Sequence, residues 1–275
     1  GRSRRGESVI HDGVSRLLTA WVGVTNVYRA GATISGVNHR TLLAFELPDA
    51  APLSPALARD LAEMEVVALG HYGLPEQTPP EAGRDQFGDE ADAELVRLTE
   101  PLTERGADVE TRVVFGRARA KTIDRVATEA GCDVVFVPGE TETAGVDSVF
   151  VPLRGGENTA SVVSFAAELA TASDAAVTVF HDSEESDRRP GEELIADAVE
   201  QLTDGGVARD RIDSQLATAD EVSQDIVERA SGFDAVVLGE SDPSLTERLL
   251  GARSSTITFD TERPAFVVGD PERRE

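Results

Sequence analysis

Short apolar runs alternate along this chain with segments whose apolar residues recur at helical spacing. The runs at residues 41–47, 65–69, 109–115 and 134–137 are rich in Val, Leu and Phe. Helices are predicted between them, at 54–63, 89–106 and 119–130. Nearly continuous apolar strands that alternate with helices are typical of a parallel sheet covered on both faces. The chain from residue 41 onward is therefore predicted to have an α/β fold.

A second series of elements follows the first in the same order. Strands are predicted at 148–153, 176–180, 213–217, 235–238 and 265–268, and helices at 159–171, 192–202, 221–231 and near 244–250. The order indicates an internal repeat, and a repeat decides the architecture before any single motif does.

Two stretches show the repeat most clearly, Arg125–Gly139 and Ile226–Gly239. Each reads as the end of a helix, a break before Asp133 or Asp234, a short apolar strand and a glycine. Gly139 lies too close to Ser148 for a further helix and strand, so the first copy looks truncated. We predict two tandem doubly wound domains, 41–147 and 148–275, the first without its last helix and strand.

The segment 1–40 differs from the rest, because six arginines against Glu7 and Asp12 give it a charge of +4. Its apolar residues Ile10, Val14, Leu17, Leu18 and Trp21 recur at helical spacing. Such a helix suits a membrane surface or a transporter partner, or it packs on the acidic domains as a lid.

Two further segments also carry specific predictions. The segment Asn26–Val37 is expected to add a strand that covers the truncated edge of the first copy. The stretch Gly73–Gly88 is expected to be a loop, because it contains three prolines.

The net charge of −25 excludes a basic stripe of the kind that nucleic acid requires. Lys121 is the only lysine, and an acidic surface almost without lysine is typical of a protein that works in concentrated salt. A functional acidic patch is the less favoured interpretation. Cys132 is the only cysteine and has no basic neighbour, so we expect a core side chain and not a nucleophile.

No apolar run approaches the length of a membrane span, and no signal peptide is recognised. A soluble, cytoplasmic chain is expected. Because it begins with Gly, it can also be the cytosolic part of a longer membrane protein.

Several segments resemble universal stress proteins of the UspA type, a family of α/β domains related to adenine-nucleotide hydrolases. Val149–Gly156 is similar to the first strand and turn of that family, and Val177–His181 and Val67–His71 to its second strand. The stretch Asp234–Ser241, followed by Leu249–Gly251 and Pro264–Val268, resembles its fourth strand, phosphate loop and last strand. The resemblance covers roughly residues 40–270 and implies two such domains.

ATP-binding members of the family carry an aspartate after the first strand and a loop Gly-x2-Gly-x9-Gly-Ser/Thr. In the second copy Arg154 takes the aspartate position, and the loop reads Gly239-x2-Asp242-x8-Gly251-Ala252. A carboxylate at Asp242 would repel a phosphate. In the first copy Pro48 and Asp49 are taken as the positions after strand one, and Gly139-Glu-Thr-Glu follows strand four.

Bound ATP is therefore not the favoured prediction, although ATP stays an alternative cofactor. The residues through which ATP or another anion would bind are Arg154, Gly239, Ser241, Gly251, Arg253, Ser254 and Ser255.

The sequence pattern puts His71 and His181 at equivalent strand ends, which raises the question of a metal. Neither has a second ligand at suitable spacing apart from Asp182, so structural histidines are expected and no metal site is predicted. No Gly-x-Ser-x-Gly elbow and no acid–base pair is recognised, so no catalytic residue is predicted either.

Three functions remain as hypotheses. The first is a non-catalytic stress-response or regulatory protein of the universal stress type, whose two sheets pack through their edges and whose partners are proteins or further copies. The second is the soluble regulatory tail of a membrane transporter. The third is a nucleotide binder with weak ATPase activity.

Overall fold

The computed structural model describes residues 39–138, 145–183, 188–218, 229–240 and 263–269. All of them belong to the larger of the two units into which the chain divides, residues 34–275. The strands are β1 (Arg40–Leu47), β2 (Glu65–Gly73), β3 (Val109–Gly116), β4 (Val134–Val137), β5 (Ser148–Leu153), β6 (Ala176–Ser183), β7 (Ile212–Thr218), β8 (Ala235–Gly239) and β9 (Ala265–Val268). The helices are α1 (Pro55–Leu61), α2 (Pro80–Thr103), α3 (Arg119–Ala130), α4 (Thr159–Ser173), α5 (Arg188–Asp204) and the 3-10 turn η2 (Arg209–Arg211).

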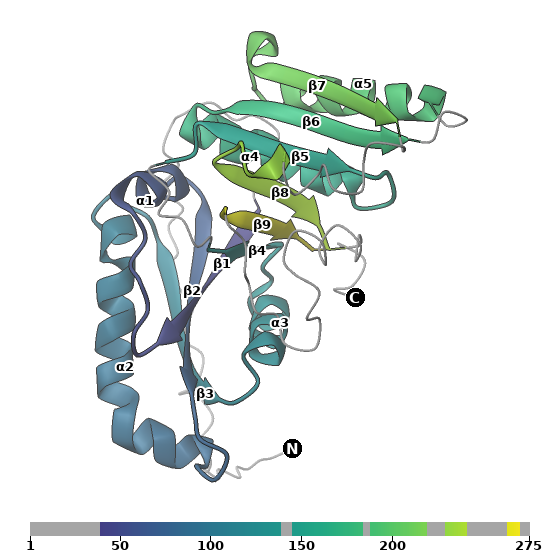
Figure 1. The fold of residues 1–275 in the computed structure, drawn as a ribbon. Coiled ribbons are helices and arrows are strands. Elements are labelled where there is room, and N and C mark those ends of the chain that lie inside the picture. The colour runs from purple at the N-terminus through teal and green to yellow at the C-terminus, as the bar shows by residue number, and fades with distance from the viewer. Residues whose placement is uncertain (1–38, 139–144, 184–187, 219–228, 241–262, 270–275) are drawn as a thin grey trace, which may run out of the picture. The chain divides into compact units, whose positions relative to one another are not determined.

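The strands form one sheet of nine strands in the order β3-β2-β1-β4-β9-β8-β5-β6-β7 (Figure 1). Its neighbouring strands run parallel except for β4 and β9, which pair antiparallel with Val134 opposite Val268. The predicted α/β class with a mostly parallel sheet is therefore confirmed.

The order divides at the antiparallel pair into two halves. In the first half the strands run β3-β2-β1-β4, and in the second they run β7-β6-β5-β8 and end with β9. In each half the strand order reverses next to the first strand. The reversal lies between β1 and β4 in the first half and between β5 and β8 in the second. The second half thus repeats the order of the first and adds one strand.

The edge of β4 is covered in a way that the sequence did not predict. β4 has β1 on one side and β9 on the other, so both of its edges are paired. The expectation that Asn26–Val37 covers this edge is therefore wrong, because β9 of the second half already satisfies the backbone groups there. The segment itself lies outside the described residues.

Helices cover the two faces of the sheet unequally. The buried side chains of α1, α2, α4 and α5 belong to one continuous core on one face, which extends across both halves. On the other face α3 packs Ile123 and Val126 against Val67 and Leu69 of β2. Side chains that point to opposite faces of the sheet cannot contact one another.

Aromatic rings join the halves inside the core. Phe266 of β9 lies 5.1 Å from Phe136 of β4 and 5.3 Å from Phe165 of α4, measured between ring centroids. Phe266 is fully buried. Ring pairs at this separation add to the stabilisation from the buried area itself.

Polar contacts join the halves as well. His39, just before β1, contacts Glu168 of α4 with 2.8 Å between Nδ1 and the carboxylate. The fully buried Asp60 of α1 accepts a hydrogen bond of 2.9 Å from the backbone N–H of Val146, just before β5. A buried carboxylate needs such donors, so Asp60 fixes the connection between the halves.

Most elements lie within a few residues of their predicted bounds, with one clear correction. The stretch 80–88, expected to be loop, is the first part of α2. Pro79 is the N-cap and Pro80 the first residue of the helix, where proline is tolerated because no intrahelical N–H bond is lost. The predicted helices at 221–231 and 244–250 lie mostly or wholly outside the described residues.

Candidate functional site

The carboxyl ends of the strands are where a sheet of this order binds ligands, beside the strand at which the order reverses. In the second half that place is the crevice between β5 and β8. Arg154 follows β5 directly, and Gly239 ends β8. The structure thus places these two predicted residues at the same edge of the sheet.

Arg154 is engaged with an acid from the neighbouring strand. Its Nη2 atom lies 3.4 Å from Oδ2 of Asp182 on β6, and the two side chains are 35% and 12% exposed. A cation paired with an acid therefore stands where ATP-binding members of the resembling family carry a free aspartate.

Asn158, which the sequence did not single out, crosses the same crevice. Its Nδ2 atom donates a hydrogen bond of 2.9 Å to the Val268 carbonyl of β9, and the residue is 4% exposed. It stands at the N-cap of α4 without capping that helix, because its amide reaches across to β9. An Asn directly before a helix is the only signal that could have pointed to it.

Asn158 also explains the glycine at the end of β8. A Cβ atom at Gly239 would lie 3.1 Å from Asn158 Nδ2 and 3.2 Å from a methyl group of Val162. A side chain at Gly239 would therefore force Asn158 or Val162 to shift by a few tenths of an ångström, so this packing favours glycine whatever binds nearby. The other predicted residues, Ser241, Gly251, Arg253, Ser254 and Ser255, lie outside the described residues, and their role stays a prediction.

In the first half, two equivalent aspartates identify the position that corresponds to Arg154. The N–H of Arg40 donates to Asp133, and the hydroxyl of Ser148 donates to Asp234. Arg40 and Ser148 therefore correspond, and six residues further on Glu46 corresponds to Arg154. Pro48 and Asp49 follow β1 directly, as predicted, because β1 ends at Leu47, but in register they lie beyond the position of Arg154.

Glu46 and Arg119 form a looser pair than their counterparts in the second half. Arg119, the first residue of α3, donates from Nη2 to the Ala44 carbonyl at 3.1 Å. Its Nε atom lies 3.8 Å from Glu46, whose side chain is 69% exposed. Burial lowers the pKa of Arg119, while Glu46 opposes that shift. This pair joins β1 to α3, whereas the pair of Arg154 and Asp182 joins the end of β5 to β6.

The two histidines are not equivalent, contrary to the sequence interpretation. A Cβ atom at Gly70 would lie 3.4 Å from Leu95 of α2, so His71, the next residue of β2, points to the opposite face, toward α3. His181 lies against α5, where a Cβ atom at Gly191 would approach its ring to 2.7 Å. The alternation of side chains along each strand puts them on opposite faces.

Their hydrogen bonding differs as well. Nδ1 of His181 donates to the Leu153 carbonyl at 2.7 Å. His71 is 2% exposed, and neither of its ring nitrogens has a hydrogen-bond partner. Burial, and secondarily Arg119, lowers the pKa of His71 below its ordinary value of 6.5.

Cys132 has the environment that was expected. It is 5% exposed on the α3 face of the sheet, and burial raises the pKa of its thiol to about 11. The prediction of a core side chain is confirmed. In the part of the chain that the structure describes, no group of three or more His, Cys, Asp or Glu residues is arranged to hold a metal ion.

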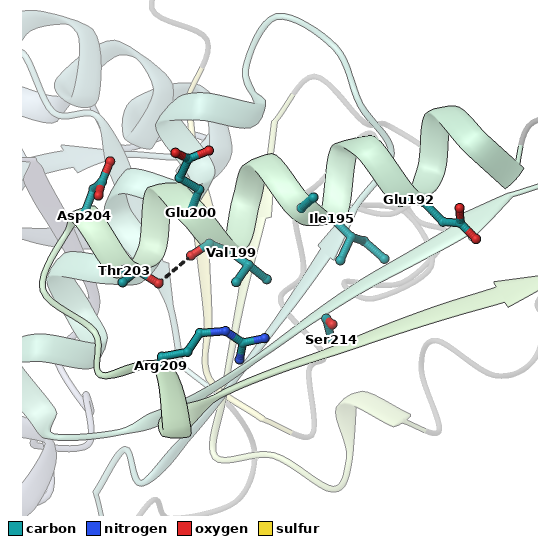
Figure 2. A pocket seen from close by; sticks show the side chains of 9 residues that line it. Glu192, Ile195, Val199, Glu200, Thr203, Asp204, Arg209 and Ser214 are labelled. Carbon is teal, nitrogen blue, oxygen red and sulfur yellow. Dashed lines mark hydrogen bonds between the residues drawn. The ribbon is translucent and has the colours of Figure 1, made fainter.

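An open groove of about 510 Å³ lies on the outer side of the second half, beside α5 and the amino end of β7 (Figure 2). Glu192, Glu200 and Asp204 line it together with Arg209, whose guanidinium donates to the Ile212 carbonyl at 2.8 Å. The groove runs along the outer side of α5, its walls mix three acidic with three aliphatic residues, and most of these are exposed. We therefore do not place the functional site there.

Comparison with solved structures identifies the fold. A universal stress protein from Archaeoglobus fulgidus DSM 4304 is similar over 83% of this chain and 96% of its own, with a TM-score of 0.53 and 12% sequence identity. The fold is that of the universal stress proteins. At this identity the likeness shows the fold alone.

Two further similar structures have lower TM-scores, and nothing is inferred from them. A putative universal stress protein from Pseudomonas aeruginosa UCBPP-PA14 matches 84% of this chain and 93% of its own, at 15% identity and a TM-score of 0.48. The cytoplasmic domain of a prokaryotic cation chloride cotransporter matches 84% and 95%, at 12% identity and 0.45. No family model and no curated protein sequence matches the chain. Among the described residues, none of the helices is both long and apolar enough to cross a membrane.

Proposed function

We propose that this chain is a non-catalytic, cytoplasmic regulatory protein with two universal stress domains fused in tandem. The repeated strand order supports two domains, and the antiparallel pair β4–β9 supports their fusion into one pseudo-dimer. The first domain lacks a fifth strand, so β9 serves both domains at once. Further copies or protein partners would add at the outer strands, β3 and β7.

One observation carries the proposal that nucleotide binding is lost in the second domain. At the reversal of strand order, Arg154 pairs with Asp182 and Asn158 bonds to the Val268 carbonyl. A nucleotide there would have to displace a buried amide from its hydrogen bond, and no acidic side chain replaces the aspartate of ATP-binding members. Displacing such a hydrogen bond without replacing it is costly.

The proposal is tested by calorimetric titration of the whole chain with ATP in concentrated salt. Excess inorganic phosphate in the buffer occupies any simple anion site, so that only recognition of the nucleotide gives heat. We expect no saturable heat at millimolar ATP. Saturable binding that is weakened by Asn158→Ala would contradict the proposal and favour the ATP-binding alternative.

The charge of +4 in residues 1–40, against −29 in the remainder, favours a second candidate, the regulatory tail of a membrane transporter. Such a basic segment suits the cytoplasmic side of a membrane. Reading the complete gene tests this candidate. Apolar spans encoded directly upstream would support it, and their absence would leave the free regulatory protein.

A further inference from the structure

A buried histidine without partners lies at the carboxyl end of β2. His71 is 2% exposed, and both of its ring nitrogens lack a hydrogen-bond partner. Buried polar side chains are nearly always hydrogen-bonded, so an unpaired imidazole of this kind points to a partner that the protein itself does not supply. The ring faces the first turn of α3.

The amino end of α3 is uncapped and carries positive charge, and the first turn of α5 is also basic. Its N-cap, Ala118, makes no side-chain capping bond, and no acidic residue stands in the first turn. Arg117, Arg119 and Lys121 stand there instead, and Lys121 is the only lysine in a chain of net charge −25. Cations are unfavourable at this end of a helix, because its N–H groups already carry partial positive charge.

Helix α1, unlike α2, α3 and α4, has a side-chain cap at its amino end. The hydroxyl of Ser54 accepts a hydrogen bond of 3.1 Å from the N–H of Leu57, and proline fills the first turn. An uncapped first turn alone is not a site, but the unpaired imidazole of His71 lies beside this one, so an external anion could take the place of the capping side chain here.

Gly116, the last residue of β3, lies between the histidine and the helix. A Cβ atom at this glycine would lie 4.0 Å from His71 Nε2 and 4.0 Å from Thr122 Oγ1, which is ordinary contact distance. An alanine would therefore fit without collision, and its methyl group would occupy the space that the two polar atoms border.

We propose that His71, Thr122 and the first turn of α3 form a binding site for a phosphate-type anion, either free phosphate or a small phosphate monoester. The imidazole and the hydroxyl supply hydrogen bonds, the helix supplies N–H groups, and Arg117, Arg119 and Lys121 supply positive charge. Glu46 is the local competitor for Arg119, and its 69% exposed side chain can turn into solvent when the anion binds.

This site differs from the place where the fold would hold a nucleotide. It lies at β2 and β3, whereas the reversal of strand order in the first half lies between β1 and β4. His71 with its lowered pKa is neutral near pH 7, so the ring can donate one hydrogen bond and accept another. The inference goes beyond the proposed function and does not depend on it.

The test is calorimetric titration of the whole chain with inorganic phosphate and, separately, with glycerol 3-phosphate, at constant ionic strength in chloride. Gly116→Ala should weaken binding about tenfold or more, the loss expected for one obstructed polar contact. Lys121→Gln should weaken it about two- to fivefold through the lost helix-end charge. Tighter binding of the monoester than of phosphate would identify the monoester as the ligand class, and the reverse order would identify free phosphate.

Gly73→Ala is the matched control. Gly73 pairs with Gly116 in the sheet, and a Cβ atom there has nothing within 4 Å. The control should bind like the parent chain, and thermal unfolding should show that both alanine variants are folded. Absence of saturable binding by either probe, or equal affinity in Gly116→Ala and the parent, would overturn the proposal.

Discussion

The two halves of the sheet have the same strand order, but side chains of opposite charge stand at equivalent positions near the carboxyl ends of their first strands. At these positions the first half carries Glu46 and the second carries Arg154. The first half buries a histidine without partners, and the second bonds its histidine to a carbonyl. The repeat keeps the aspartates that anchor Arg40 and Ser148, so the framework tolerates this divergence.

The difference shows where binding capacity remains. In the second half, Arg154 pairs with Asp182 and the Asn158 amide N–H bonds to the Val268 carbonyl, while the buried Oδ1 atom of Asn158 has no hydrogen-bond partner. In the first half, an unpaired imidazole and an uncapped helix lie side by side, and an anion could satisfy both. The two edges therefore differ in the kind of group left unpaired, because an amide oxygen only accepts hydrogen bonds and does not attract an anion, whereas an imidazole can donate one.

The largest effect should follow from separating the halves. Phe266→Ala removes a fully buried ring between Phe136 and Phe165 and should lower the free energy of unfolding by about 3–5 kcal/mol. Chemical denaturation in concentrated salt measures it. Val96→Ala, at a 63% exposed position of α2, is the control and should change stability by about 0.5 kcal/mol or less. Equal effects of the two variants would show that the halves are not joined through this ring.

A matched pair of histidine variants sharpens the comparison directly. His181→Leu removes the bond to the Leu153 carbonyl and should cost about 1–3 kcal/mol. His71→Leu removes two unpaired buried nitrogens and should be neutral or stabilising. Denaturation midpoints of both variants test this. If His71→Leu proved the more damaging of the two, the assignment of an unpaired imidazole would fail.

The pH dependence of stability should also distinguish His71. Burial holds its pKa in the folded state below 6.5, so the unfolded state takes up the proton first as the pH falls. Stability is therefore retained above pH 6.5 and decreases below it, by at most about 1.4 kcal/mol per pH unit. The parent chain should lose stability relative to His71→Leu below that pH. A difference between the two that does not change with pH would contradict the shift.

The smallest effect is expected at Arg154. Because its pair with Asp182 is partly exposed, Arg154→Gln should cost about 1 kcal/mol or less, and less still in concentrated salt. Arg189→Gln, which breaks the far more exposed pair with Glu193, should have no measurable effect. Urea denaturation at low and high salt compares them. A loss at Arg154 that grows with added salt would rule out an ionic contribution.

The sequence predicted the order of elements well, because apolar runs such as 134–137 and 148–153 depend on local composition. It failed at α2, since the two prolines that begin this helix also occur in loops. It could not predict that β9 pairs with β4, because pairing between distant strands leaves no local pattern.

The candidate site was predicted only in part. Arg154 and Gly239 were found through the resemblance to universal stress proteins, but their neighbours Asp182 and Asn158 depend on strand register and on the direction of one side-chain amide. His71 and Arg119 come together only because one lies on the α3 face of β2 and the other begins α3. Matching the two strands by sequence gives His71 and His181 equivalent positions. Only the structure shows that their side chains lie on opposite faces of the sheet.

The most direct test of the contrast between the two edges is a crystal structure of the whole chain grown with both phosphate and a non-hydrolysable ATP analogue. The account predicts an anion bordered by His71, Gly116 and Thr122, with Arg154 still paired to Asp182 and no nucleotide between β5 and β8. A nucleotide bound in that crevice, with the first edge empty, would contradict it.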